Sequence, residues 1–277
     1  MIFIDMHCHS NFSDGKETPT WLAKRAKHRG VSFMALTDHD TTDGVAEFCH
    51  EAKHLGIRTT TGIEFSAEPP FDGTLHILAF RFDPKNEKIL SLVPRLAEMR
   101  EERNRQIAIK LQKLGYDITL EEVEQESGCG VVARPHFARL LAKKGLVRSE
   151  KDAFTCFLMR GAAAYVDRQR LTIDECFNVI KSAGGLPVLA HPIQCRLSDN
   201  KLDKFVAELK EKGLWGLEVF YGTNTVGTTK KHLELARKYN LATTAGSDFH
   251  SLNSHNHAKD IGISVEENTM PWAKVFS

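Results

Sequence analysis

The sequence predicts an α/β fold, either a parallel sheet or a (β/α) barrel, from two features of its pattern. Short apolar, β-branched segments alternate with longer segments typical of amphipathic helices, which favours parallel strands joined by helices. Most of the apolar segments are also followed at once by a histidine or an acid. Because the active site of a barrel lies at the carboxyl ends of its strands, this second feature predicts a functional site there.

The first eighty residues show the alternation clearly. Thr18 and Pro19 predict the start of a helix that ends at Gly30, since threonine caps helices, proline fits the first turn and glycine follows the end. A second helix is expected over 43–55, closed by Gly56. The expected strands are 2–4, 31–37, 57–65 and 75–80.

The pattern changes between residues 87 and 165, where we find no convincing strand. Residues 87–113 favour one long helix, and Pro94 is expected to set a boundary or a kink in it. Thr119 and Glu122 have the spacing of a capping box. Further helices are expected from Arg134 to before Gly145 and over 150–160. We therefore predict a helical insertion, residues 87–165, within a barrel formed by residues 1–86 and 166–277.

The alternation resumes after the insertion. Thr172 and Glu175 form a second capping box, which predicts a helix that stops at Gly184. The remaining expected elements are strands over 186–190, 214–220 and 241–246 and helices over 200–212 and 228–239. The whole chain then has about seven strands, a number consistent with a (β/α) barrel.

Composition excludes several classes of protein. The net charge of +1 argues against a dominant non-specific polyanion binder, and no apolar stretch approaches the roughly 18 residues of a membrane span. The first residues lack the pattern of a signal peptide. Six scattered cysteines without a CxxC pair predict free thiols in a reducing cytoplasm. We expect a cytoplasmic protein without a membrane, and we infer no obligate protein partner.

The acids and histidines at the strand ends predict a metal centre. His7 and His9 are two apart on a strand, so their imidazoles point the same way, and neutral imidazole is a common metal ligand. Asp38, Asp40 and Asp43 are expected to support the ligands or to cap helices. The full set of candidate ligands is His7, His9, Asp14, His39, Glu64, His76, His191, Asp248 and His250.

Nine nitrogen and oxygen donors exceed what one ion needs. A single zinc or manganese takes three or four protein ligands, so the set predicts two or three ions, with Glu64 able to bridge two of them. Paired ions can hold a hydroxide and clamp both the attacking and leaving oxygens of a phosphoester. The absence of thiolate ligands suits Mn²⁺, which we expect first, or Mg²⁺, Fe²⁺ or Zn²⁺.

The motifs HCHSNFSDG, LTDHDTTDG, GIEFSAE, LAHP and GSDFH occur in this order, with a strand histidine after the third. In this respect the whole chain resembles the PHP (polymerase and histidinol phosphatase) family. The resemblance implies a distorted seven-stranded, TIM-like (β/α) barrel with three metal ions. Some relatives have histidine in place of Asp14. Carried over by motif, the ligand groups are His7, His9, Glu64 and Asp248 for the first ion, Glu64, His76 and His191 for the second, and Asp14, His39 and His250 for the third.

Two further motifs resemble one branch of that family. ARPHFA and the segment Tyr165 to Arg168 are similar to enzymes that dephosphorylate nucleoside 3′,5′-bisphosphates, some of which also trim RNA 5′ ends. Many relatives have proline where this chain has Asp167. The resemblance implies that Arg134, His136 and Arg168 bind substrate.

The chemistry of Arg134 and Pro135 supports a phosphate site independently. Proline at a helix start leaves the following N–H groups free, and the helix dipole favours an anion there. Arginine adds a planar, bidentate donor. Lys143, Lys144 and Arg170 are expected on the solvated surface.

Together with the resemblance to that branch, these residues predict hydrolysis of the 3′-phosphate of a nucleoside 3′,5′-bisphosphate, such as pAp to AMP, by a metal-bridged hydroxide. Glu64, His191, Asp248 and Arg134 would serve catalysis, and Arg134 with His136 would hold the 5′-phosphate. The alternatives are a 5′-3′ exoribonuclease acting on short 5′-phosphorylated RNA, a histidinol phosphate phosphatase and a non-catalytic metal-binding module. The complete ligand set argues against the last. Amidohydrolases usually carry a carbamylated lysine, and no lysine stands at a strand end here.

Overall fold

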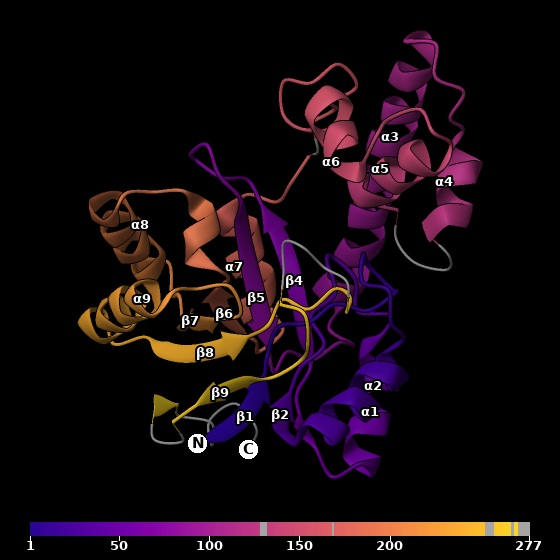
Figure 1. The fold of residues 1–277 in the computed structure, drawn as a ribbon. Coiled ribbons are helices and arrows are strands. Elements are labelled where there is room, and N and C mark those ends of the chain that lie inside the picture. The colour runs from indigo at the N-terminus through magenta and orange to yellow at the C-terminus, as the bar shows by residue number, and fades with distance from the viewer. Residues whose placement is uncertain (128–131, 168, 253–257, 267–268, 271–277) are drawn as a thin grey trace.

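The strands form two open sheets in a mixed α/β fold (Figure 1). The computed structural model describes residues 1–127, 132–167, 169–252, 258–266 and 269–270. One sheet has the order β3-β2-β1-β9 and the other the order β4-β5-β6-β7-β8. The strands are β1 (Ile2–Asp5), β2 (Val31–Met34), β3 (Arg58–Thr59), β4 (Gly62–Ala67), β5 (Leu75–Phe80), β6 (Leu186–Leu189), β7 (Gly216–Tyr221), β8 (Ala242–Gly246) and β9 (Ile263–Val265).

The strands are only partly parallel. Pairs β1–β2, β2–β3, β6–β7 and β7–β8 are parallel, whereas β5 is antiparallel to both β4 and β6, and β9 is antiparallel to β1. The link from β4 to β5 contains no helix. A short link of this kind joins antiparallel neighbours, because a parallel crossover needs a dozen or more residues. The strand β9 was not expected from the sequence.

The two sheets meet where the segments that follow β1 and β2 run beside β8 and β4. Cys8 and Phe249 form an isolated parallel bridge after β1 and β8, and His39 forms another with Glu64 on β4. The amide of Met6 also donates to the carbonyl of Ala245 at 2.8 Å. The hydrogen-bonded strands nevertheless form two separate open sheets, so the seven-stranded barrel stays a prediction.

The helices follow the sequence signals closely. Thr18 caps the first helix by accepting from the amide of Trp21 at 3.1 Å, and Thr119 and Glu122 form the expected capping box. Pro94 lies inside a continuous helix, so a boundary there was wrong, whereas the alternative of a kink stays a prediction. The helices are α1 (Pro19–Arg29), α2 (Val45–His54), α3 (Glu87–Lys113), α4 (Leu120–Ser127), α5 (Arg134–Lys143), α6 (Glu150–Ala153), α7 (Ile173–Ser182), α8 (Asp199–Glu211) and α9 (Val226–Lys238), with a π segment η1 (Phe154–Leu158) and a 3₁₀ segment η2 (Pro192–Cys195).

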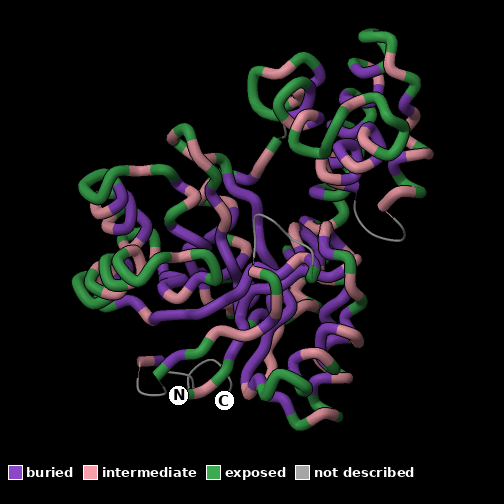
Figure 2. Tube along the Cα trace, in the orientation of Figure 1, coloured by how far each residue is buried: buried purple, intermediate pink, exposed green. Residues whose placement is uncertain are grey.

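The main core lies between the sheets and their helices. Helices α7, α8 and α9 lie on one side of the five-stranded sheet, and α1 and α2 pack on the other sheet (Figure 1). Phe65, Ile77 and Leu217 are fully buried in this core. Buried residues follow the strands and the inner helix faces (Figure 2). Within the described residues, no helix is both long and apolar enough to cross a membrane.

The helices of residues 87–165 have a second hydrophobic core. Leu111, Val123, Phe137 and Leu158 are buried in it, and no strand occurs among the described residues of this segment. In Figure 1 most of these helices stand apart from the sheets, which are reached by α3 and by Arg134 at the start of α5. The domain division at residues 86 and 165 stays a prediction.

The described cysteines, Cys8, Cys49, Cys156, Cys176 and Cys195, are free thiols.

The cap of α7 gives a stability prediction. Thr172 Oγ1 accepts from the amide of Glu175 at 3.2 Å, and the Thr172 amide donates to the Glu175 carboxylate at 2.8 Å. Thr172→Ala should lower the free energy of unfolding by about 1 kcal/mol, because the first turn of α7 loses its cap. Urea denaturation measures the change. Thr229→Ala, within α9, is the matched control and should cause no loss, since alanine is the better helix former.

Candidate metal centre

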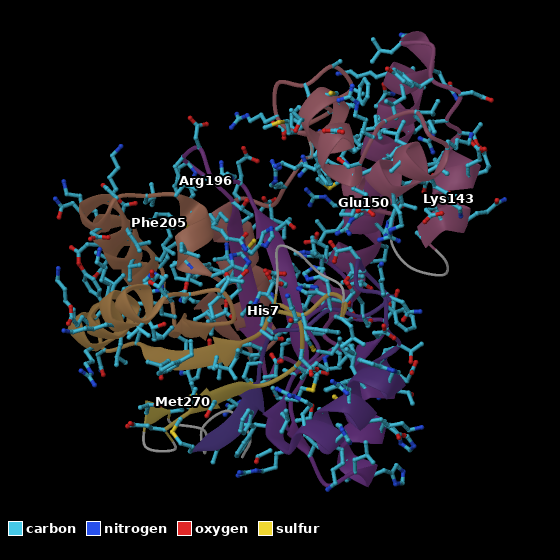
Figure 3. The ribbon with its side chains drawn as sticks, viewed as in Figure 1. His7, Lys143, Glu150, Arg196, Phe205 and Met270 are labelled. Carbon is cyan, nitrogen blue, oxygen red and sulfur yellow. The ribbon has the colours of Figure 1, made fainter. Side chains whose placement is uncertain are left out.

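The structure brings the predicted ligands together where the two sheets meet. His7 follows β1 near the middle of the molecule, whereas Lys143 and Glu150 lie in the helical group (Figure 3). Three overlapping groups have their ligand atoms within 4.8 Å of one another. These groups are His7, His9, Glu64 and Asp248; His9, Asp14, His39 and His250; and His39, Glu64 and His76.

Glu64 is the residue on which the groups converge. It lies on β4, its side chain is fully buried, and its Oε2 is 3.2 Å from Nε2 of both His7 and His9 and 3.0 Å from Nδ1 of His39. One carboxylate oxygen therefore faces three imidazoles that come from two different strand ends.

The other oxygen of Glu64 faces a separate pair. Oε1 is 2.8 Å from Nδ1 of His76 and 2.9 Å from Nε2 of His191, and these two nitrogens are 3.3 Å apart. The two oxygens thus point into different groups of nitrogen donors. This is the geometry a carboxylate needs to bridge two ions.

Asp248 and Asp14 are the other two carboxylates among the candidate ligands. Asp248 Oδ1 is 3.4 Å from His7 Nε2 and 3.1 Å from His9 Nε2. Asp14 Oδ1 is 3.2 Å from His250 Nε2 and 3.9 Å from His9 Nδ1.

His9 and His39 each face two groups, which the motif assignment does not anticipate. His9 turns Nε2 to Glu64 and Nδ1 toward Asp14. His39 likewise turns Nδ1 to Glu64 and Nε2 toward Asp14, at 3.9 Å. The set of residues gathered is as predicted, but these two histidines lie between the groups.

The donor atoms fit a cation. Within the part of the chain that the structure describes, several of these side-chain atoms are buried without a hydrogen-bond partner. Such atoms are costly unless something satisfies them, and here they converge on shared space. They are His7 Nε2, both ring nitrogens of His9, Asp14 Oδ1, His39 Nδ1, Glu64 Oε2 and His191 Nδ1.

The electrostatics of the site favour positive charge. Burial alone would lower the pKa of His9, but the negative charges of Asp248 and Glu64, which lie 3.1 and 3.2 Å from its Nε2, raise that pKa to about 10. Burial likewise opposes protonation of His7, yet Glu64, Glu218 and Asp248 raise its pKa well above the ordinary value. The same negative potential would attract divalent ions, which replace protons on such ligands.

Glu218 supports two of the histidines and was missed in the sequence. It lies on β7, fully buried, with Oε1 3.0 Å from His7 Nδ1, and its Oε2 accepts from the amide of His191 at 2.6 Å. A carboxylate on the far nitrogen fixes the orientation of a ligating imidazole. Gly246 makes room, since a Cβ there would lie 2.2 Å from the Cβ of His7 and 2.5 Å from Glu218 Oε1. The signal in the sequence was an acid inside the apolar segment LWGLEVF.

Other buried acids shape the loops that carry ligands. Asp38 accepts from the amide and hydroxyl of Ser10 at 2.7 and 2.6 Å, and from the hydroxyl of Ser13, within the segment between His9 and Asp14. Asp5 accepts from the amide and hydroxyl of Ser247 at 2.9 and 2.6 Å, and burial raises the pKa of Asp5 to about 6. These bonds place the ligands that follow each serine.

Comparison with known families matches the PHP domain to residues 5–186, more than half of the chain. The chain belongs to the PHP family. This confirms the resemblance seen in the motifs.

Two relatives of this PHP chain are named for activities on RNA or on nucleotides. A 5′-3′ exoribonuclease of Haemophilus influenzae is 33% identical over 246 residues, 89% of this chain and 89% of the relative. A 3′,5′-nucleoside bisphosphate phosphatase of Chromobacterium violaceum is 31% identical over 255 residues, 91% of this chain and 88% of the relative. A solved structure from Chromobacterium violaceum, described as an amidohydrolase with bound sulfate and no metal, has a TM-score of 0.88 and 29% identity, covering 98% of this chain and 95% of that one.

Beside the candidate ligands lies a small cavity of about 100 Å³ with an arginine-rich wall. His76 lines it together with Arg103, Arg134, Arg170 and Tyr165. Its three guanidinium groups come from α3, α5 and the segment before α7. Such a wall suits an anion, because guanidinium groups bind phosphate oxygens in a bidentate manner.

Of the predicted substrate-binding residues, Arg134 lines the cavity and His136 does not. Arg134 lines the cavity, and its Nη1 donates to the carbonyl of Leu158 at 3.2 Å. His136 is buried, does not line this cavity, and its Nδ1 accepts from the amide of Ala133 at 2.9 Å.

Arg170 and Arg168 differ in what the structure shows of them. Arg170, expected on the surface, has a side chain only 22% exposed and lies 3.1 Å from Asp167. Arg168 lies outside the described residues.

The position of Glu64 predicts how metal binding depends on it. Glu64→Ala removes both oxygens that face the two groups of imidazoles, so purified protein should hold at least one ion fewer per chain than the wild type, and phosphatase activity should be lost. Metal analysis and a manganese titration measure this. Glu234→Ala, an exposed acid on α9, is the control. A variant lacking Glu64 that keeps full metal content and activity would falsify the bridging role.

Proposed function

We propose that this chain is a metal-dependent phosphoesterase that removes the 3′-phosphate from nucleoside 3′,5′-bisphosphates. One observation carries the proposal: His76 belongs both to the ligand cluster and to the wall of the arginine-lined cavity. A substrate with two phosphates could place one at the ions and the other on the arginines.

The cluster supports hydrolysis through the residues that hold it. Divalent ions, which we propose to be two or three Mn²⁺ per chain, would supply Lewis acidity and a water of lowered pKa. Glu64 holds the two groups at a fixed spacing. Asp248 is kept in orientation by the Tyr221 hydroxyl, which donates to its Oδ2 at 2.9 Å. His191 is oriented through its amide by Glu218.

The arginines would recognise the phosphate that is not cleaved. A bisphosphate differs from a monophosphate only in this second group, so selectivity requires a cation away from the metal ligands. Arg134 meets this requirement, and Arg103 and Arg170 lie in the same wall. In this proposal His136 acts indirectly, because its Nδ1 caps the helix that carries Arg134. Arg168 keeps its role in substrate binding as a proposal from the motif alone.

We also propose an architecture for the enzyme, a barrel covered by a cap. We place β1, β2 and β4 to β8 in one distorted seven-stranded barrel, supported by the bridges Cys8–Phe249 and His39–Glu64 between the two open sheets. Residues 87–165 would form a cap on it, since Arg103 and Arg134 reach the cavity from α3 and α5. Free cysteines support a cytoplasmic enzyme, and we propose no obligate protein partner.

A second candidate function is 5′-3′ exoribonuclease activity on 5′-phosphorylated RNA. A larger groove of about 960 Å³ shares Gly73, Thr74 and Arg134 with the small cavity and also includes Phe154 and Met159. The groove offers room beyond one nucleotide, and aromatic side chains are the usual platform for stacked bases.

A phosphate-release assay tests the main proposal. Purified protein with Mn²⁺ is given nucleoside 2′-, 3′- and 5′-monophosphates, 3′,5′-bisphosphates and histidinol phosphate, and a 5′-phosphorylated oligoribonucleotide is followed by gel. The bisphosphate should have the highest kcat/KM among the small substrates, since only it fills both sites. A higher value for the oligonucleotide would favour the exoribonuclease. A preference for histidinol phosphate would overturn both.

Arg134 gives the sharpest test of the second-phosphate site. Arg134→Ala should lower kcat/KM for a 3′,5′-bisphosphate by roughly ten- to a hundred-fold, the equivalent of a charge-assisted hydrogen bond of about 1.5–3 kcal/mol. Hydrolysis of a small ester without a second phosphate should hardly change. Steady-state kinetics on both substrates provides the comparison.

Lys143→Ala is the matched control for Arg134, because Lys143 lies on the same helix with a side chain 71% exposed. Equal losses on both substrates in Arg134→Ala would place Arg134 at the reacting phosphate or in the fold instead.

A further inference from the structure

A buried ion pair connects the helix α3 to the loop that carries His39. Arg100 on α3 and Asp40 are each 4% exposed, and Arg100 Nη2 lies 2.5 Å from Asp40 Oδ2. The same Nη2 donates to the backbone carbonyl of His39 at 3.1 Å. One guanidinium therefore holds both the residue after a candidate ligand and the backbone of that ligand.

Asp40 joins this loop to the strand of Glu64 as well. Its Oδ1 accepts from the amide of Ser66 at 2.9 Å, and its Oδ2 accepts from the Ser66 hydroxyl at 3.2 Å. The Asp40 amide donates to the carbonyl of Glu64 at 3.0 Å. The carboxylate of Asp40 thus ties three elements together: α3, the His39 loop and β4.

The backbone at this junction is not relaxed. Asp40 has a φ of +56°, in the left-handed region that residues other than glycine rarely adopt. Strained positions persist where the surroundings over-determine them, and they cluster at functional sites. Here the constraint comes from the bonds to Arg100 and Ser66.

Stability alone is a poor explanation for the pair. Burying two charges costs desolvation energy that their attraction only partly returns, so apolar residues of similar size often serve as well. What the pair does supply is a fixed position for the His39 loop. Arg103, three residues later on α3, lines the arginine cavity, so the same helix also sets where that cavity lies relative to His39.

We propose that Arg100 is a positioning residue that holds His39 in place for metal binding, through Asp40 and the His39 carbonyl. The inference rests on the metal centre of the proposed function. It adds that the helix α3 forms part of the metal site, although none of its residues is a ligand.

Direct manganese titration into chelator-stripped full-length protein tests the proposal without using turnover. Arg100→Met should weaken the affinity for at least one Mn²⁺ by ten- to a hundred-fold, the usual effect of losing a group that orients a ligand. Arg100→Lys should recover only part of it, because an ammonium lacks the planar fork. Asp40→Asn, which keeps its shape and can still accept from Ser66, should resemble Arg100→Met.

Two readouts separate positioning from general destabilisation. Thermal unfolding in chelator checks that each variant is folded, and the assay is repeated at saturating Mn²⁺. Positioning predicts that kcat recovers as Mn²⁺ rises, and that a small ester and a bisphosphate lose activity in parallel at low Mn²⁺. Arg105→Ala is the control, since Arg105 is on α3 with a side chain 48% exposed and pairs with Glu101 there.

Unchanged Mn²⁺ affinity in both folded Arg100→Lys and folded Asp40→Asn would overturn the inference. So would a loss confined to the bisphosphate, since that would mean that Arg100 acts on the arginine cavity alone. Wild-type protein that binds Mn²⁺ but releases no phosphate would instead remove the proposed function and leave the positioning role of Arg100 intact.

Discussion

A fully buried carboxylate with imidazole nitrogens facing both of its oxygens is the constraint on which this structure depends. Glu64 loses its hydration on folding, so its charge has to be met by cations or by hydrogen-bond donors. The histidines alone do not satisfy it, because several of their nitrogens and Glu64 Oε2 have no hydrogen-bond partner among the described residues. Strand ends from both sheets converge on this one residue, which explains why the sheets meet there although they do not pair along their length.

The sequence predicted which acids and histidines gather around Glu64, because their signal is local. An imidazole or a carboxylate directly after an apolar strand indicates which edge it occupies, and the two-residue period shows that His7 and His9 share a face. Capping boxes such as Thr172 with Glu175 are local in the same way. Pro94 misled the prediction because the apolar residues of α3 around it, including Ile89 and Leu96, pack on the core and keep the helix continuous.

What the sequence could not predict depends on partners distant in the chain. Glu218 faces His7 across 211 residues, and Arg100 meets Asp40 across 60, so neither contact leaves a spacing that can be recognised. The pairing of β9 with β1 likewise joins segments distant in the chain and leaves no local pattern. Arg170 was misjudged for the same reason, since only the folded chain shows that it shares a wall with Arg134.

The unusual backbone at Asp40, His191 and Asp248, each with a positive φ, links folding to metal supply. Such conformations cost free energy that the unfolded chain does not bear. An ion that binds only the folded chain offsets this cost in proportion to the logarithm of its concentration over its dissociation constant. If the proposed divalent ions bind here, the fraction of unfolded chains exposed to proteases would therefore rise when that metal is scarce. A cell starved of the metal would lose the protein through turnover as well as its activity.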